Sequence, residues 1–176
     1  EDGLTWTFKL RKNSTWSNGT PVTAHDFEYS WKRTLTPETA AEYSYIMADI
    51  VGSSTKEIQE NGVDGVGVKA LDDYTLEVKL NRPVAYFAEL VSFQVFFPQN
   101  QAFVESCGDA YGSAADKQLY NGPFTLTSWK MEDQFTMEKN PNYWDAANVK
   151  LNKINTKVVK DTGAEVSLYE AGQIDR

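Results

Sequence analysis

The sequence predicts a mixed α/β (α+β) fold, with a small mixed-sheet domain over residues 1–99 followed by part of a larger unit over residues 100–176. Three observations predict it. Residues 4–35 have the pattern of a strand, a turn and a capped helix without a gap, and residues 66–80 have that of a two-stranded hairpin. After a polar stretch, alternation returns at residues 124–139, which indicates a second sheet.

The first strand is predicted from residues 4–10, where apolar and polar side chains alternate. Asn18 and Gly19 then tolerate the positive φ angles of a tight turn. The spacing of Thr23 and Asp26 predicts a capping box at the start of a helix of about three turns. Its apolar stripe consists of Phe27, Trp31 and Leu35.

Pro37 marks the start of a second predicted helix that runs to Ile50, because apolar residues recur there at three- and four-residue steps. Residues 52–67 are rich in Gly, Ser and charge, which favours a loop with a short helix at 55–60. Two strands joined by an acidic turn at Asp72 and Asp73 follow.

Helical segments are expected at the start of residues 83–93 and at residues 100–107, where Gly108 would end the helix. Beyond the second pair of strands, residues 153–160 are a further strand candidate. A closing helix is expected at residues 162–171, with Val166 and Tyr169 facing inward. We also expect Trp6, Trp16 and Trp129 to lie in the core.

Composition excludes several classes of protein. The chain has 17 basic and 25 acidic residues, a net charge of -8, which argues against a surface for nucleic acid or anionic membranes. No stretch reaches the roughly 18 apolar residues that cross a bilayer. The single Cys107 cannot form an intramolecular disulfide, and no Cys/His spacing suggests a metal site. We therefore expect neither a cofactor nor a metal.

One series of residues forms a family signature: Leu10, Arg11, Trp16, Ser17, Gly19, Pro21, Val22, Thr23, Ala24, Asp26, Phe27, Tyr29, Ser30 and Trp31. This series resembles the motif of the extracytoplasmic oligopeptide-binding proteins, family 5 of the solute-binding proteins of peptide ABC transporters. Further landmarks follow in the family's order at residues 36–40, 68–73, 121–124, 138–145 and 172–175. The resemblance covers essentially the whole chain.

The resemblance implies a fold and a function. Residues 1–99 would be the small domain of the first lobe of a two-lobed periplasmic-binding-protein-like fold, and residues 100–176 a segment of the large lobe. Because the chain starts just before a core strand, we expect it to be a piece of a longer protein. The family's lobes close around an extended peptide and deliver it to a membrane permease, outside the cytoplasm, in the periplasm or on a lipid anchor. We expect a monomer without enzymatic activity.

The resemblance also assigns candidate ligand residues. In relatives, a tyrosine of the small domain points toward the peptide, and Tyr43 stands at the matching place, with Tyr45 as a weaker candidate. Glu42 and Thr36 depart from the family's usual proline and aspartate. The alternative for Tyr43 is packing in the helix core beside Ile46 and Met47.

Asn121 and Gly122 are the other candidates, in a loop expected near the cleft between lobes. The alternative is a turn with a purely structural role, since Asn bonds its own chain and Gly takes unusual backbone angles. The residue that pairs with a peptide's amino terminus lies in family regions outside this chain, so we expect residues 1–176 alone to bind peptide poorly.

Other functions stay open as alternatives. Family members also bind dipeptides, nickel complexes or sugars, and the five tryptophans allow a carbohydrate-binding module. A carboxylate enzyme would use Asp72 with Asp73 or Glu132 with Asp133, but neighbouring residues in a turn point in different directions, so both pairs are expected to be solvated hairpin tips. His25 is expected to face solvent.

Overall fold

The computed structural model describes residues 2–175, which form two three-stranded sheets with short helices between them. The strands are β1 (Thr5–Lys9), β2 (Val68–Asp72), β3 (Thr75–Lys79), β4 (Phe124–Lys130), β5 (Gln134–Lys139) and β6 (Lys153–Lys157). The α-helices are α1 (Ala24–Leu35), α2 (Thr55–Asn61), α3 (Phe87–Leu90), α4 (Gln101–Cys107) and α5 (Thr162–Glu170). The predicted α/β class, with two sheets, is confirmed.

The first sheet has the order β1-β3-β2, and both of its pairings are antiparallel. β1 and β2 run in the same direction, but β3 lies between them, as in a split β-α-β unit. The expectation of a mixed sheet is therefore wrong for the described strands of this domain. The predicted hairpin is confirmed, with a register irregularity between Ala70 and Asp72 just before its turn.

The core lies on one face of this sheet. Trp6 and Phe8 stand opposite Val78 and Leu76, so their side chains share a face. Helix α1 covers that face with Trp31, whose indole N–H donates to the backbone oxygen of Phe96 at 2.8 Å. The opposite face carries Thr, Lys and Glu side chains, as in an antiparallel sheet with one side in water.

The capping box at the start of α1 is confirmed. The Asp26 carboxylate accepts the backbone N–H of Thr23 at 2.8 Å, and the stripe residues Trp31 and Leu35 are buried. The expected short helix near 55–60 is α2, and α4 begins after an Asn100 cap and ends at Gly108, which has a φ of +52°. Of the segment at residues 83–93, four residues form α3.

The predicted helix over residues 37–50 is wrong. This segment forms two 3-10 turns, Pro37–Thr39 and Ser44–Met47. Ala40 between them has a φ of +49°, a left-handed conformation that no α-helix contains. Met47 and Ile50 still reach the core, but Tyr43 is 43% exposed and does not pack inside as the alternative required.

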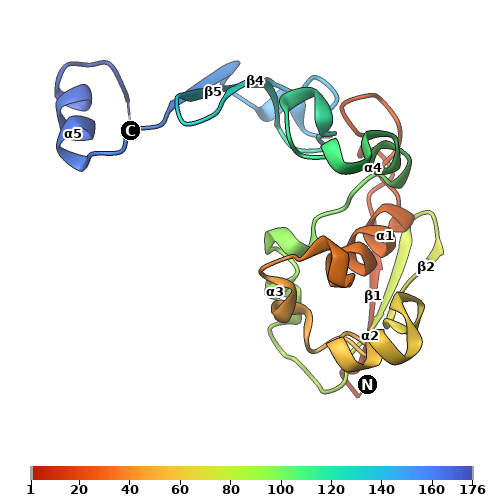
Figure 1. The fold of residues 1–176 in the computed structure, drawn as a ribbon. Helices are drawn as coiled ribbons and strands as arrows, with labels where there is room; N and C mark the ends of the chain where they lie inside the picture. The colour runs from red at the N-terminus through yellow and green to blue at the C-terminus, as the bar shows by residue number, and fades with distance from the viewer. Residues whose placement is uncertain (1, 176) are drawn as a thin grey trace.

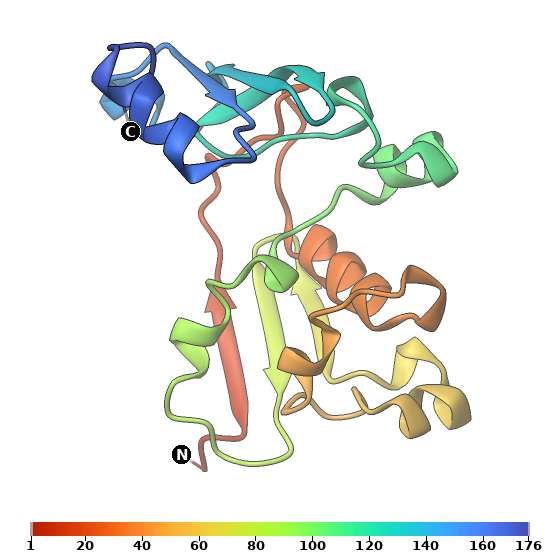
Figure 2. The ribbon, with the colours of Figure 1, turned by 60° about the vertical axis from the view of Figure 1, so that its left-hand side comes forward.

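A crossing loop, residues 11–22, runs from β1 to the second sheet and back to α1 (Figure 2). Its two arms meet in a β-bridge between Thr15 and Pro21. Its tip bonds to the later part of the chain, since the Ser17 N–H donates to the Tyr120 carbonyl at 2.6 Å. The chain passes to the second sheet again through residues 97–100. Whether a domain boundary lies at 99 stays a prediction.

The second sheet has the order β4-β5-β6, again antiparallel, and confirms the strands predicted beyond residue 124. Among the described residues, every buried hydrophobic side chain lies between Trp16 and Val104, so this sheet buries little. Trp129 is 42% exposed, and its assignment to the core is wrong, whereas Trp16 is buried and Trp6 packs partly buried against the core.

Helix α5 projects from the end of this sheet (Figure 1). Its Val166 and Tyr169 are exposed, which contradicts the inward orientation expected for them. Ala164, Val166 and Leu168 occur at every second position, and this spacing spreads apolar side chains around a helix instead of along one face. No helix within residues 2–175 is long and apolar enough to cross a membrane.

Candidate functional site

Three exposed aromatic side chains, Tyr43, Tyr45 and Phe93, form an aromatic patch on the first domain. The ring of Tyr43 lies 5.5 Å from that of Phe93, edge to face, and 6.2 Å from that of Tyr45. Aromatic pairs in this range attract each other beyond the area they bury. The patch is therefore a preformed apolar surface whose tyrosine hydroxyls supply polar tips.

The position of Tyr43 follows from the turn that it begins. Its backbone oxygen accepts the N–H of Ile46 at 3.1 Å, which closes the 3-10 turn Ser44–Met47. Met47 at the end of that turn is buried and anchors it. The buried Met47 thus holds the backbone of this turn in place, while the phenol ring of Tyr43 remains exposed.

A groove of about 330 Å³ lies beside the patch. Its lining residues are Arg33, Thr34, Thr39, Ala41, Glu42, Tyr43, Gln94, Val95 and Gln99. The Arg33 guanidinium donates to the Gln99 side-chain oxygen at 3.1 Å and stands 5.3 Å from the ring of Tyr111. The groove thus offers amide groups, one cation and one carboxylate next to an apolar surface.

Asn121 and Gly122 lie elsewhere, at the junction of the two sheets. Asn121 lines a cavity of about 530 Å³ together with Lys9, Leu10, Arg11, Ser14, Val22, Phe27 and Trp144. Within it, the Arg11 guanidinium stands 3.7 Å from the centroid of the Trp144 ring, a cation–π contact. Trp144 therefore packs a loop against the first domain while its exposed part lines the cavity.

The loop that carries Asn121 and Gly122 is held by Asn140, which is 1% exposed. The Asn140 side-chain amide donates to the Gly122 carbonyl at 2.9 Å, and its backbone N–H donates to the Pro123 carbonyl at 2.9 Å. Its side-chain oxygen accepts the N–H of Asn142 at 3.0 Å. This arrangement supports the structural role of the turn and leaves the ligand role of Asn121 untested.

The structure thus places the four candidates in two separate surfaces, Tyr43 with Tyr45 and Asn121 with Gly122. Sequence reasoning missed Phe93 and Arg33, which meet Tyr43 only through the fold. Phe93 stands 50 positions from Tyr43 in an aromatic-rich segment, and no local spacing links the two. Asn140 could have been found from its place between Lys139 and Pro141, where Asn commonly bonds its own backbone.

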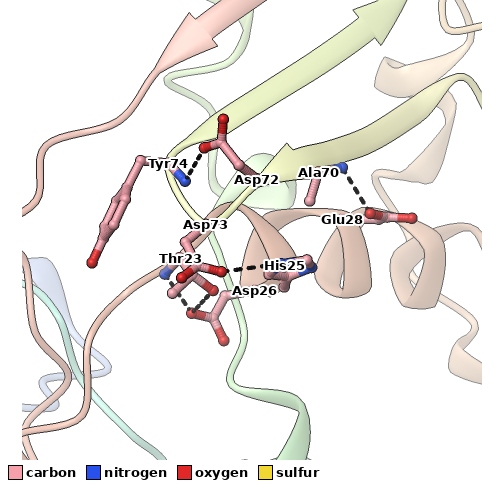
Figure 3. Close-up of polar contacts among 8 residues, drawn as sticks. All are labelled: Thr23, His25, Asp26, Glu28, Ala70, Asp72, Asp73 and Tyr74. Atoms are coloured by element: carbon pink, nitrogen blue, oxygen red, sulfur yellow. Dashed lines mark hydrogen bonds and ion pairs between the residues drawn. The ribbon is translucent and has the colours of Figure 1, made fainter.

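The acidic turn at Asp72 and Asp73 has a structural role. The Asp72 carboxylate accepts the N–H of Tyr74 at 2.8 Å, which lowers the pKa of Asp72 (Figure 3). Asp73 stands 3.4 Å from the His25 ring nitrogen, and both side chains are exposed, as expected for His25. Within residues 2–175 there is no group of three or more His, Cys, Asp or Glu placed to hold a metal ion.

Comparison with known proteins gives one family. The model of the bacterial extracellular solute-binding proteins, family 5 Middle, matches residues 1–176. The chain is 41% identical to the oligopeptide-binding protein OppA of Bacillus subtilis (strain 168) over 175 residues, 99% of this chain and 32% of that protein. It is 40% identical to the dipeptide-binding protein DppE of the same organism, also over 99% of this chain and 32% of that protein.

The fold of a solved relative agrees. The crystal structure of the oligopeptide ABC transporter (substrate-binding domain) of Bacillus anthracis str. Ames superposes with a TM-score of 0.94 at 49% identity, covering 99% of this chain and 34% of that one. The chain therefore spans about a third of the length of the relatives that it matches.

Proposed function

Because the chain belongs to family 5 of the bacterial extracellular solute-binding proteins, we propose that its protein captures extended oligopeptides and delivers them to the membrane permease of an ABC importer. The observation that carries this proposal is the aromatic patch of Tyr43, Tyr45 and Phe93 beside a groove lined with amides. Within this family, such a surface suits a ligand with a repeating polar backbone and variable side chains.

The chemistry of the patch favours a peptide over other ligands. Tyrosine rings present apolar faces to side chains of many kinds, and their hydroxyls donate or accept hydrogen bonds. Gln94 and Gln99 in the groove carry both donors and acceptors, which match the N–H and C=O groups common to every peptide. Backbone recognition gives affinity with little dependence on sequence.

The charges of the groove fit the same ligand. Arg33 is partly buried and already bonded to Gln99, and Glu42 is exposed at the groove's edge. A ligand with both an amine and a carboxylate meets one opposite charge for each of these groups. A uniformly anionic or cationic ligand meets only one favourable charge.

The remaining parts of the proposal follow the family. The protein acts as a monomer outside the cytoplasm, in the periplasm or as a lipoprotein on the outer face of the membrane, and its partner there is the permease. It catalyses no reaction, so capture by closure of two lobes around the peptide is the whole of its chemistry. Asn121 and Gly122 contribute from the edge of the cleft.

A dipeptide is the second candidate ligand, because the chain is nearly as similar to a dipeptide-binding protein (40% identity) as to an oligopeptide-binding one (41%). The patch favours longer peptides, since three aromatic rings in a row offer more contact surface than two residues need.

Calorimetric titration of the complete natural protein that contains residues 1–176 tests the proposal. We expect pentaalanine to bind with a dissociation constant in the micromolar range or below, dialanine more weakly, and maltotriose or a nickel–histidine complex not at all. Tighter binding of dialanine would assign the dipeptide instead. Binding of maltotriose or the nickel complex, with no peptide bound, would overturn the proposal.

A further inference from the structure

We propose that Asp26 is a positioning residue that locks the crossing loop (residues 11–22) and the return segment (residues 97–100) to α1, and so fixes the first domain against the second sheet. Through this lock, Asp26 sets the direction in which the aromatic patch faces, a consequence that rests on the proposed function. Both chain crossings between the two sheets meet at this one residue.

The carboxylate of Asp26 is 7% exposed and serves three donors with one oxygen. Oδ2 accepts the backbone N–H of Thr23 at 2.8 Å, the Thr23 hydroxyl at 3.4 Å and the indole N–H of Trp16 at 3.2 Å. Figure 3 shows Thr23 and Asp26 facing each other at the start of α1. The cap of the helix and the anchor of the crossing loop are thus the same atom.

Trp16 connects the Oδ2 atom of Asp26 to the second sheet. Its side chain is 2% exposed, at the centre of the crossing loop. On either side of it, the loop bonds to the later part of the chain: Thr15 donates its hydroxyl to the Asn142 carbonyl at 2.9 Å, and Asn142 donates its amide to the Ser17 carbonyl at 2.9 Å. The Ser17 hydroxyl accepts the Tyr120 N–H at 3.2 Å. Movement of Trp16 would therefore move the contacts to the second sheet.

The return segment is held from the backbone of the same residue. The Asp26 carbonyl accepts the N–H of Gln99 at 3.2 Å, and one turn later the Ser30 hydroxyl donates to the Phe97 carbonyl at 2.6 Å. Gln99 also accepts from Arg33 and lines the groove beside Tyr43. The junction and the candidate ligand surface are therefore connected by direct contacts.

Buried polar groups of this kind act as fixed points because breaking one bond leaves the partner unsatisfied. An unpaired buried donor costs free energy, which opposes rotation of one part against the other. An apolar contact tolerates sliding, whereas a carboxylate with three donors accepts one geometry.

Distance measurement between two spin labels tests the lock directly. Labels at Gln59→Cys on α2 and Thr127→Cys on β4, both exposed, are placed in the complete natural protein with Cys107→Ser. Asp26→Ala should broaden the distance distribution at least twofold. Asp26→Asn, which keeps an acceptor oxygen, should leave it narrow. Trp16→Phe, which removes the indole donor together with part of the ring, should broaden it.

Ser53→Ala is the matched control, because Ser53 is a buried polar residue of the first domain whose hydroxyl lacks a partner in the described part of the chain. It should leave the distribution unchanged. If Asp26→Ala does not fold, the distance distribution of Trp16→Phe tests the proposal instead, since this variant keeps the carboxylate. If the Trp16→Phe and Asp26→Ala variants both fold and both have a distance distribution as narrow as that of the wild type, the proposal is overturned. If Asp26→Ala is unfolded, a narrow distance distribution for Trp16→Phe alone overturns it.

The effect of Asp26 on ligand binding is measured separately, as peptide affinity. Pentaalanine affinity should fall at least fivefold in Asp26→Ala and return to within twofold of the wild type in Asp26→Asn. The label distances can be measured without a ligand. If the protein binds no peptide, the proposed function is refuted, but the label distances still test whether Asp26 fixes the two parts against each other. A broadened distribution with unchanged pentaalanine affinity would overturn the part concerning the aromatic patch.

Discussion

The Glu28 carboxylate on α1 accepts the backbone N–H of Ala70 at 2.8 Å, so a helix side chain satisfies the outer edge of strand β2. The same carboxylate bonds to Lys32 one turn later at 2.7 Å. β2 is an edge strand, and unpaired N–H groups on such strands invite pairing with other chains. Glu28 therefore both docks the helix on the sheet and closes part of its open edge.

Glu28→Gln keeps an acceptor oxygen for the Ala70 N–H but removes the charge. It should lower the free energy of unfolding by about 1 kcal/mol at pH 7, because a hydrogen bond to a charged group contributes about 1.5–3 kcal/mol and one between neutral groups about 0.5–1.5 kcal/mol. Burial raises the pKa of Glu28, but the bonds from Lys32 and Ala70 outweigh burial, so its pKa lies below the ordinary value. A lowered pKa means that the stabilisation is present above the unfolded-state pKa and is lost as the pH falls through the folded-state value.

Urea unfolding of both proteins at pH 7 and near pH 3 measures this effect. Glu60→Gln is the control, because Glu60 pairs with Lys56 at the same i,i+4 spacing but on an exposed surface, where such pairs contribute less than about 0.5 kcal/mol. Equal losses in the two variants at pH 7 would mean that the charge of Glu28 adds nothing to its bond with Ala70.

Tyr43→Ala should weaken binding of pentaalanine by up to roughly tenfold, because it removes the central ring of the aromatic patch and an aromatic contact contributes about 0.5–1.5 kcal/mol. Tyr43→Phe keeps the ring and should lose less. Tyr86→Ala removes another exposed tyrosine, outside the patch, and serves as the control. Calorimetry in the complete natural protein gives the affinities, and identical values for Tyr43→Ala and Tyr86→Ala would remove Tyr43 from the site.

The stability of the wild type relative to Asp26→Asn should rise as the pH falls. Burial raises the pKa of Asp26, and hydrogen bonds from Thr23 and Trp16 only partly offset this. With a raised pKa, the favourable neutral form is fully present below the unfolded-state pKa and is lost as the pH rises through the folded-state value. Each unit of pKa difference corresponds to about 1.4 kcal/mol.

Chemical unfolding between pH 4 and pH 7 checks this sign. The Asp26→Asn variant lacks the titrating group, so the difference (the gap) in the free energy of unfolding between the two proteins reports the contribution of Asp26 alone. A gap that shrinks on acidification would indicate a lowered pKa at Asp26 and contradict the prediction.

Local patterns predicted most of the first domain because its signals are short-range. Thr23 and Asp26 are three residues apart, and the Asp72–Asp73 turn joins strands that are neighbours in sequence. The segment around Tyr43 was predicted wrongly because apolar residues at three- and four-residue steps also fit successive 3-10 turns. The left-handed Ala40 that separates those turns has no signature in an alanine.

Which residues are buried and which residues make up the candidate site depend on long-range contacts, and the periodicity of apolar residues in the sequence does not predict such contacts. Trp129 is a large apolar residue in a strand, yet whether anything covers its face is decided elsewhere in the fold. In the same way, Tyr43 and Asn121 were chosen by resemblance, whereas their neighbours Phe93 and Arg11 are brought beside them by the path of the chain. The ligand roles of Tyr43, Tyr45, Asn121 and Gly122 stay predictions.

Asn140→Ala should destabilise the protein by about 1–3 kcal/mol, because it leaves the part-buried Gly122 carbonyl and Asn142 N–H without their bonds to this side chain. It should also release the loop that carries Asn121, since the side chain of Asn140 ties Gly122 to the start of the following turn. Asn140→Asp is the discriminating variant. It keeps the acceptor for Asn142 but places a buried carboxylate against the Gly122 carbonyl, so the bond to the loop is replaced by a repulsion.

Amide hydrogen exchange at residues 120–124 measures that release, and thermal unfolding measures stability. Both variants should exchange faster in this loop, and Asn148→Ala, which removes an exposed bond to Asp145 at 2.7 Å, should leave the loop unchanged. If Asn121 binds ligand, pentaalanine affinity falls in Asn140→Asp together with loop protection. If the loop loosens while affinity holds, the turn is structural and the ligand role of Asn121 is excluded.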